Sequence, residues 1–231
     1  MNIAVVLAGG SGQRMHLEVP KQFAFVKGKP IIVYTMEAFQ KHPNIDAIYA
    51  VCIQGWEEIL KGYAKQFAIT KLAGVILGGK NGQESAYNAA KVLKNHYKDD
   101  DIILLHDANR PLISQEIISD SLVQCQKKGV AIAGIPCTEP LFVKENNEAA
   151  QKCLPRDKLI RTQTPHTLNL KKLLWAHEEA LNRGIQNSIA TGTILIELGE
   201  TVYLSIGAES NFKLTTQEDL NLFRAMLDLH K

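Results

Sequence analysis

The strongest chemical signal in the chain is a glycine-rich turn that follows the apolar run Ile3–Leu7. Without side chains, glycines let a ligand approach the backbone and let several amides point toward it. Two cations, Arg14 and Lys21, stand shortly after the turn. Inward amides beside fixed positive charges predict a triphosphate site. The residues of the turn that we expect to bind it are Ala8, Gly9, Gly10 and Gly12.

Two other glycine motifs for phosphate binding do not fit this turn. A dinucleotide-binding fingerprint needs a third glycine where Met15 stands. A Walker motif needs Gly-Lys followed by serine or threonine, but the two Gly-Lys pairs are followed by Pro30 and Asn81. The turn therefore predicts a different class of nucleotide site.

A second cluster with chemical potential contains Asp107 and Arg110, directly after the apolar run Ile102–Leu105. A carboxylate at the carboxyl end of a parallel strand lies at the ligand-binding edge of the sheet. Mg²⁺ takes one or two carboxylates together with phosphate oxygens, so Asp107 is a candidate Mg²⁺ ligand. Arg110 would either pair with a nucleotide phosphate or fix the loop through an internal ion pair.

A third cluster, Ser210–Thr216, contains Lys213 within an otherwise apolar stretch that we interpret as a short strand. An inward ammonium group there requires an anion. Thr216 with Asp219 resembles a capping box with aspartate in place of glutamate, which predicts the start of a helix.

These clusters require a framework, and the chain alternates short apolar runs with amphipathic segments. This alternation predicts an α/β fold: a mostly parallel, Rossmann-like sheet with helices on both faces. Predicted strands are Ile3–Leu7, Ala47–Ile53, Gly74–Leu77, Ile102–Leu105, Val130–Ile135 and Thr201–Ser205. Predicted helices are Ile31–Gln40, Glu57–Phe67, Gln83–Asn95, Gln115–Lys127, Leu170–Asn182 and Gln217–Leu229.

The segment Thr138–Gln163 interrupts this alternation. It contains two prolines, an Asn-Asn pair and mixed charge, and it is too long for an ordinary connection. We interpret it as a protruding arm of a single domain spanning residues 1–231, packing on a second subunit. The alternative is an unstructured surface loop.

Composition limits the class of protein. The 231 residues are 45% hydrophobic and 22% charged, with a net charge of +2, so a sizeable core is expected and a nucleic-acid or membrane-surface binder is not. The first apolar run is too short for a signal peptide and no run reaches the length of a membrane span. Four scattered cysteines without a Cys-x-x-Cys pair fit a reducing cytoplasm.

Taken together, the clusters resemble the family of 2-C-methyl-D-erythritol 4-phosphate cytidylyltransferases and the related ribitol-5-phosphate cytidylyltransferases. The matching motifs appear in the family's order along the whole chain. They are Leu7–Gly10 with Gly12, Arg14 and Met15; Pro20–Gln22; Gly78-Gly79 with Ser85; His106–Ala108 with Arg110-Pro111; Gln163–Pro165; and Asn211–Thr215.

The resemblance implies an enzyme that transfers CMP from CTP to a small polyol phosphate and releases pyrophosphate, with Mg²⁺ as cofactor and a homodimer as the active form. It assigns the triphosphate to the glycine turn with Arg14 and Lys21. Gly79 and Ser85 would contact the cytosine end, and Asp107 would bind Mg²⁺. The acceptor phosphate would face Lys213, Arg156 and Thr164.

The sequence also departs from the family's pattern. Gly82 stands where the family has arginine, and Asn109 where alanine or valine is usual. The segments Thr138–Lys144 and Ile189–Thr193 replace an Asp-Thr-x-Lys and a Thr-Asp motif. The nucleotide half is retained and the acceptor half altered, so the acceptor stays open: methylerythritol phosphate, ribitol phosphate or another small phosphate of a surface glycan.

Two further alternatives stay open. One is a nucleotidyltransferase for a hexose 1-phosphate or a molybdopterin cofactor that uses another nucleotide; Asp107–Pro111 and Gln163–Pro165 disfavour it. The other is a non-catalytic nucleotide-binding relative, motivated by the altered acceptor segments.

Overall fold

The computed structural model describes residues 1–10 and 19–229, which are built around a seven-stranded sheet. Its strands are β1 (Asn2–Ala8), β4 (Ala47–Cys52), β5 (Leu72–Leu77), β6 (Ile102–Asp107), β7 (Val130–Pro136), β10 (Ile160–Asn169) and β11 (Leu204–Ile206). Their order across the sheet is β11-β7-β10-β6-β1-β4-β5. Of these strands only β10 runs antiparallel to its neighbours, so the predicted mostly parallel sheet is confirmed.

Seven α-helices occur in the described part of the chain, and none has the length and apolarity that crossing a membrane requires. They are α1 (Ile31–Lys41), α2 (Glu57–Gln66), α3 (Gly82–Lys94), α4 (Gln115–Lys128), α5 (Leu170–Asn182), α6 (Thr191–Glu197) and α7 (Gln217–Leu229). Short 3₁₀ helices are η2 (Lys21–Phe23), η3 (Arg156–Lys158) and η4 (Glu209–Asn211).

Polar caps explain where several helices begin. The side chains of Asn81, Ser114 and Asn169 accept hydrogen bonds from backbone amides in the first turns of α3, α4 and α5. The predicted capping box before α7 is present: Thr216 N donates to Asp219 Oδ2 at 2.8 Å, and Asp219 N donates to Thr216 Oγ1 at 3.2 Å.

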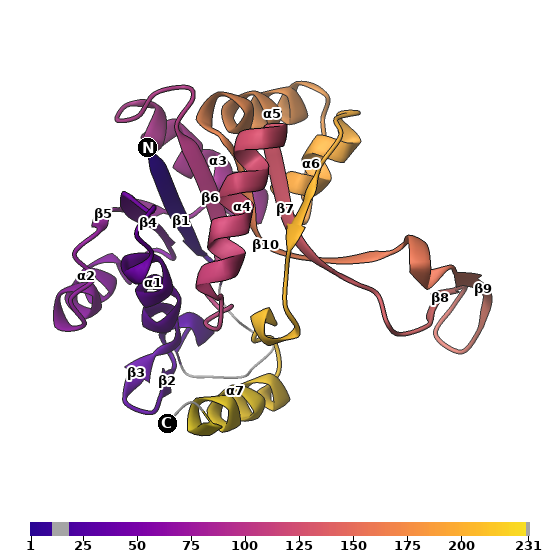
Figure 1. Ribbon diagram of the computed structural model, residues 1–231, viewed down its shortest axis with the longest axis horizontal. Helices are drawn as coiled ribbons and strands as arrows, with labels where there is room; N and C mark the ends of the chain where they lie inside the picture. Colours follow the sequence, from indigo (N-terminus) through magenta and orange to yellow (C-terminus); the bar gives the residue numbers. More distant parts are fainter. Residues whose placement is uncertain (11–18, 230–231) are drawn as a thin grey trace.

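The sheet buries both faces because successive strand residues point to opposite sides. In β1, Ile3 and Val5 pack with α3, α5 and α6, whereas Ala4 and Val6 pack with α1, α2 and α4. Figure 1 shows these helices on the two sides of the sheet. A third cluster packs Leu220 and Phe223 of α7 against Ala24, Val26 and Ile31, which lie in and beside the β2–β3 hairpin (Phe25–Val26, Lys29–Pro30). It holds the C-terminal helix against that hairpin.

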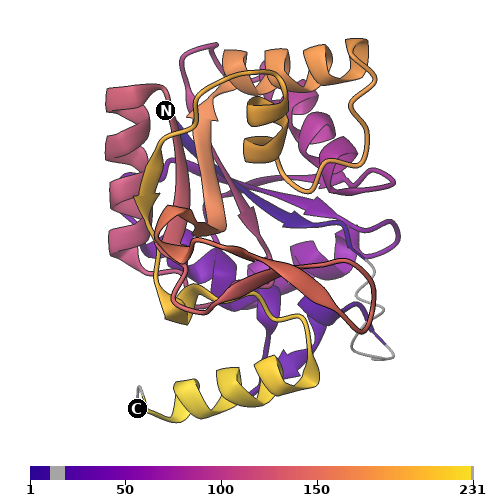
Figure 2. The same cartoon turned by 90° about the vertical axis from the view of Figure 1, so that its right-hand side faces the viewer.

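The predicted excursion is an arm that leaves the sheet after β7 and returns at β10 (Figure 1). Its far end is a hairpin of β8 (Leu141–Lys144) and β9 (Ala150–Leu154), and in Figure 2 it points toward the viewer. Ile160 already pairs with Pro136, so residues 160–163 belong to the sheet and the arm is shorter than predicted. The arm has regular structure, which is contrary to the alternative of an unstructured loop.

Two elements of the central sheet and its helices were not predicted, and one local expectation was wrong. β10 was not predicted, because Pro165 and a run of polar residues are unusual in a central strand; the strand accommodates them at a register shift between Thr162 and His166. α6 was not predicted either, and it buries Ile194 and Leu195. Lys213 does not lie in a strand; its segment between η4 and α7 has no regular structure.

Candidate active site

A cleft of about 880 Å³ opens at the carboxyl ends of β1, β4, β5 and β6. Ten predicted site residues line it: Ala8, Gly9, Gly10, Lys21, Gly79, Ser85, Asp107, Arg110, Thr164 and Lys213. Two predicted residues, Gly12 and Arg14, lie outside the described residues. Arg156 is exposed on η3 in the arm and does not line the cleft of its own chain.

The two glycine motifs touch each other at one end of the cleft. A Cβ atom on Gly9 would lie only 3.1 Å from Ser85 Oγ, so a side chain there would crowd Ser85. Ser85 Oγ accepts a hydrogen bond from Gly79 N at 3.0 Å and donates one to Asn81 O at 2.8 Å. Ser85 thus shapes the second turn, and its position brings that turn against the first.

Lys21 and Gln22, on η2, join the first glycine turn to the other side of the cleft. Gln22 is buried, and its Nε2 donates to Ala8 O at 2.7 Å and to Gly10 O at 2.9 Å. Lys21 Nζ donates to Leu214 O at 3.1 Å. Sequence reasoning gave Gln22 no role, although its place beside Lys21 in the same motif was a usable signal.

Asp107 pairs with Lys213, whose side chain is exposed and not inward as the predicted strand implied. Its Oδ2 lies 3.1 Å from Lys213 Nζ and 3.1 Å from Arg110 Nε. Burial alone would raise the pKa of Asp107, but the charges of Lys213 and Arg110 outweigh it and hold the pKa at about 2. The carboxylate is therefore ionised at neutral pH, and the internal ion pair considered for Arg110 is present.

The backbone of Asp107 is fixed by a chain of hydrogen bonds through His106. Burial lowers the pKa of His106 to about 4, so the ring is neutral. Arg110 O, 3.2 Å from Nε2, can only accept, so Nε2 carries the hydrogen. Nδ1 must then accept from the Thr164 hydroxyl at 2.9 Å, and Thr164 Oγ1 accepts from Asp107 N at 3.1 Å. The hydroxyl proton of Thr164 is thus used within the protein.

A second buried histidine, His166, supports the wall of the cleft. Its Nδ1 accepts a hydrogen bond from Gly192 N at 3.0 Å, which ties β10 to the beginning of α6. Burial lowers its pKa to about 4. Both histidines are therefore neutral and hydrogen-bonded within the fold, as expected for structural residues.

Gln163 and Asn211 fix the segment that carries Lys213, a role that the sequence did not reveal. Gln163 exchanges two hydrogen bonds with the backbone of Ala208, at 2.8 and 3.2 Å. Asn211 is fully buried and donates to Gln163 Oε1 at 3.2 Å and to Thr164 O at 2.9 Å. Both residues belong to the family motifs Gln163–Pro165 and Asn211–Thr215. The motifs indicated that these residues matter, but their role in holding the Lys213 segment could be assigned only from the fold.

The positions that depart from the family's pattern face the same cleft or lie in the arm. Gly82, Ile189, Ala190 and Thr191 line the cleft, and Leu141–Lys144 forms β8. The loop before Ile189 is held by α3, since Ser188 N donates to Gln83 Oε1 at 2.9 Å and Gln83 Nε2 donates to Ile185 O at 2.9 Å. Substitution at these positions therefore changes one wall of the cleft.

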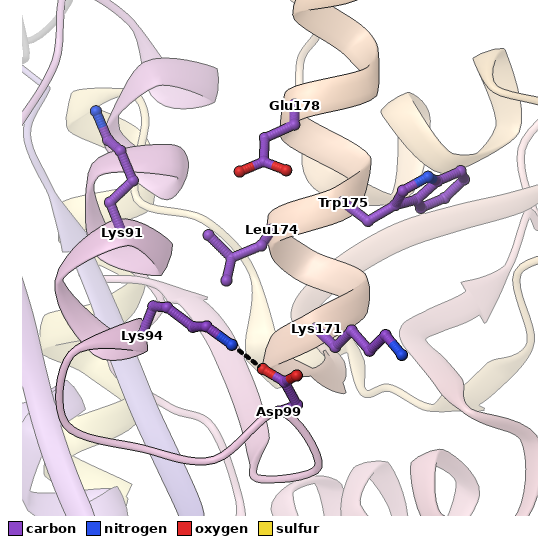
Figure 3. A pocket seen from close by; sticks show the side chains of 7 residues that line it. All are labelled: Lys91, Lys94, Asp99, Lys171, Leu174, Trp175 and Glu178. Atoms are coloured by element: carbon purple, nitrogen blue, oxygen red, sulfur yellow. Dashed lines mark hydrogen bonds and ion pairs between the residues drawn. The ribbon is translucent and has the colours of Figure 1, made fainter.

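A second hollow, of about 380 Å³, lies between α3 and α5 (Figure 3). It is near the amino end of β6, at the opposite end of that strand from Asp107, because Asp99 lines it and precedes β6. Lys94 and Asp99 form an ion pair there, and Lys171 also lines it. None of the predicted site residues that the structure describes lines this hollow, so the cleft is the candidate site.

Replacing Thr164 with valine should destabilise the fold, because Asp107 N and His106 Nδ1 both lose their partner. We expect the free energy of unfolding to fall by roughly 1–3 kcal/mol for the buried groups left unpaired. Urea denaturation measures it, with Thr164→Ser as the control that retains the hydroxyl. Equal midpoints for the valine variant and the parent would contradict the hydrogen-bond chain.

Comparison with known proteins agrees with this arrangement. Residues 2–229 match the family model described as IspD, 2-C-methyl-D-erythritol 4-phosphate cytidylyltransferase. The ribitol-5-phosphate cytidylyltransferase of Lacticaseibacillus paracasei is 43% identical over 229 residues, with 98% of each chain covered. The 2-C-methyl-D-erythritol 4-phosphate cytidylyltransferase of Clostridium botulinum is 32% identical over 228 residues, covering 98% of this chain and 97% of its own.

The fold has solved counterparts. The crystal structure of the Francisella tularensis 2-C-methyl-D-erythritol 4-phosphate cytidylyltransferase matches with a TM-score of 0.82 at 25% identity, over 97% of this chain and 99% of that one. The family match spans nearly the whole sequence, and each of the six motifs contributes at least one described residue to the lining of the cleft. The chain belongs to the IspD family of cytidylyltransferases.

Proposed function

We propose that this protein transfers CMP from CTP to ribitol 5-phosphate and releases pyrophosphate. The observation that carries the choice of acceptor is the 43% identity, over 98% of both chains, to a ribitol-5-phosphate cytidylyltransferase. Relatives named for 2-C-methyl-D-erythritol 4-phosphate are 32% identical. The altered cleft wall at Gly82 and Ile189–Thr191 is a further reason to expect an acceptor other than methylerythritol phosphate.

The reaction is an in-line displacement at phosphorus. An oxygen of the acceptor phosphate forms a bond to the α-phosphorus of CTP, the bond from that phosphorus to the β-phosphate oxygen breaks, and pyrophosphate leaves with the electron pair. Both reactants are anions, so the enzyme must place them and offset their repulsion. Four basic residues and one acidic residue among the described residues line the cleft: Lys21, Lys80, Arg110, Lys213 and Asp107.

The residues divide between the two substrates. We assign the triphosphate to the glycine turn with Lys21 and Arg14, and the cytosine end to Ser85 and Gly79. Lys213 serves the acceptor phosphate. For Thr164 to donate to that phosphate as well, its hydroxyl must rotate away from His106 Nδ1.

No general base is required, because a phosphate monoester is mostly dianionic at neutral pH. This agrees with the two histidines near the cleft. Burial lowers the pKa of His106 and of His166 to about 4, and each ring is hydrogen-bonded to the fold. We therefore assign neither histidine a proton-transfer step.

Asp107 is the residue that would hold Mg²⁺. Within the described residues no group of three or more acidic, histidine or cysteine side chains could form a metal cage by itself. A single ionised carboxylate at the cleft fits a metal that is bound mainly by nucleotide phosphates. When bound, Mg²⁺ would neutralise phosphate charge and polarise the α-phosphorus.

Free thiols support the cytoplasm as the site of this reaction. The structure has four unpaired cysteines, three of them buried. Thiols persist in a reducing compartment, and disulfides are typical of oxidising ones.

The acceptor can be tested by measuring pyrophosphate release with CTP and Mg²⁺ on ribitol 5-phosphate, methylerythritol 4-phosphate and other small phosphates in parallel. We expect turnover on ribitol 5-phosphate to exceed that on the others, with CDP-ribitol as the product identified by mass. Preference for methylerythritol 4-phosphate would overturn the acceptor but not the chemistry. Silence on every acceptor, with CTP still bound, would favour a non-catalytic relative.

Lys21→Ala should lower turnover by roughly 10²–10³, by analogy with the loss of one donor aimed at the charge of a transition state. Steady-state kinetics with saturating CTP measures this loss. Lys171→Ala, in the second hollow, is the matched control and should retain the parent's turnover. A Lys21→Ala enzyme within threefold of the parent would remove Lys21 from the reaction.

We also propose that the arm forms a homodimer and that Arg156 completes the partner's acceptor site. The arm exposes three adjacent apolar residues, Leu141, Phe142 and Val143, with Phe142 68% exposed. Arg156 does not line the cleft of its own chain, so an acceptor contact by this residue requires a second copy.

This arrangement can be tested by complementation. Arg156→Ala and Lys213→Ala enzymes should each be nearly inactive, but co-expressing them should restore about a quarter of the parent's turnover. Half of the dimers are then mixed, and each mixed dimer has one intact site. No recovery in a preparation shown by mass to contain mixed dimers would mean that Arg156 does not act across subunits.

A further inference from the structure

Two loops meet beside the ion pair of Asp107, and Asn109 joins them with both its backbone and its side chain. Leu214 N donates to Asn109 O at 2.8 Å, and Asn109 Nδ2 donates to Leu214 O at 2.7 Å. Asn109 is 5% exposed and Leu214 is fully buried. This two-bond clip therefore fixes the peptide groups on both sides of Leu214.

The Leu214 carbonyl is shared with the catalytic lysine of the nucleotide side. Lys21 Nζ donates to it at 3.1 Å, and a carbonyl oxygen has two lone pairs, so Asn109 and Lys21 together saturate it. The direction of this carbonyl sets where the ammonium group of Lys21 can lie.

The same clip also determines the position of Lys213. The amide that Leu214 donates to Asn109 O belongs to the peptide bond between Lys213 and Leu214. Since Leu214 is anchored in the apolar cluster with Phe223, the backbone of Lys213 cannot shift while the clip holds. Its side chain, 42% exposed, then reaches Asp107 Oδ2 at 3.1 Å.

We propose that Asn109 is a positioning residue: its side-chain amide orients the Leu214 carbonyl that receives Lys21, and its backbone carbonyl holds the amide next to Lys213, so that the two lysines keep a fixed separation in the cleft. The inference rests on the proposed cytidylyltransferase function. Asn109 links the triphosphate side and the acceptor side through one residue, Leu214, which lets the two reacting phosphates be placed relative to each other.

The test begins with Asn109→Ala, which removes the side-chain donor and leaves the backbone bond from Leu214 N in place. We expect turnover to fall by roughly ten- to a hundredfold, because a small misplacement of the reacting groups lowers the rate by about this much. Gln115→Ala is the matched control, because Gln115 Nε2 makes a similar side-chain bond to Ala38 O at 2.9 Å and neither residue lines the cleft. The control should retain the parent's turnover.

A double-mutant cycle separates positioning from general loosening of the fold. In a Lys21→Ala background, Asn109→Ala should cost less than about twofold further, because the group it positions is gone. Equal losses in both backgrounds would overturn the proposal, as would an Asn109→Ala enzyme as active as the control. If the alanine variant does not fold, Asn109→Ser replaces it in the same cycle. The serine side chain is one bond shorter than that of asparagine, so its hydroxyl does not reach Leu214 O. A parent without activity on any acceptor would instead refute the proposed function.

Discussion

The cleft is organised around one ionised carboxylate held between two cations. Asp107 Oδ2 receives both Arg110 and Lys213, and their charges outweigh the cost of burial and keep its pKa at about 2. Asp107 and Arg110 are mostly buried, so removing either one would leave the other as a poorly solvated, unpaired charge. The pairing of Asp107 with Lys213 depends in addition on the distance between the two loops that carry them. The surrounding hydrogen bonds of His106, Thr164 and Asn109 hold the two loops at the separation that this pairing requires.

The one antiparallel strand of the seven-stranded sheet, β10, explains how the second half of the chain reaches the cleft. Ligands bind at the carboxyl ends of parallel strands, and those ends supply Ala8 and Asp107. Because β10 runs in the opposite direction, its amino end lies at the same edge: Ile160 pairs with Pro136, whereas Asn169 pairs with Ile102. Reversing one strand therefore brings Thr164 and the base of the arm to the ligand edge.

Helices and strands could be predicted from the sequence where apolar periodicity and capping residues alone determine them. The strands containing Ile3–Leu7 and Ile102–Leu105 and the helices starting at Leu170 and Gln217 were predicted, because apolar periodicity and caps act over a few residues. β10 was missed because Pro165 is tolerated only through a register shift that depends on two neighbouring strands. The anion required by Lys213 was expected, but its identity as Asp107, 106 positions earlier, follows from the fold alone. The hydrogen bond between the Thr164 hydroxyl and His106 Nδ1 likewise depends on the tertiary structure and could not be predicted from the sequence.

The described residues of the cleft carry less positive charge than the two phosphate substrates carry negative charge. This difference is a reason to expect Mg²⁺, Arg14 and Arg156 at the site. A triphosphate and a phosphate monoester bring about six negative charges together at neutral pH. Four basic residues and one acidic residue line the cleft, a net charge of +3 among the described residues. Mg²⁺ on Asp107, Arg14 beside the glycine turn and Arg156 from a second subunit would together add four positive charges. Of these three, Mg²⁺ would arrive with the nucleotide, so that two of the four charges enter the cleft together with the triphosphate that they offset.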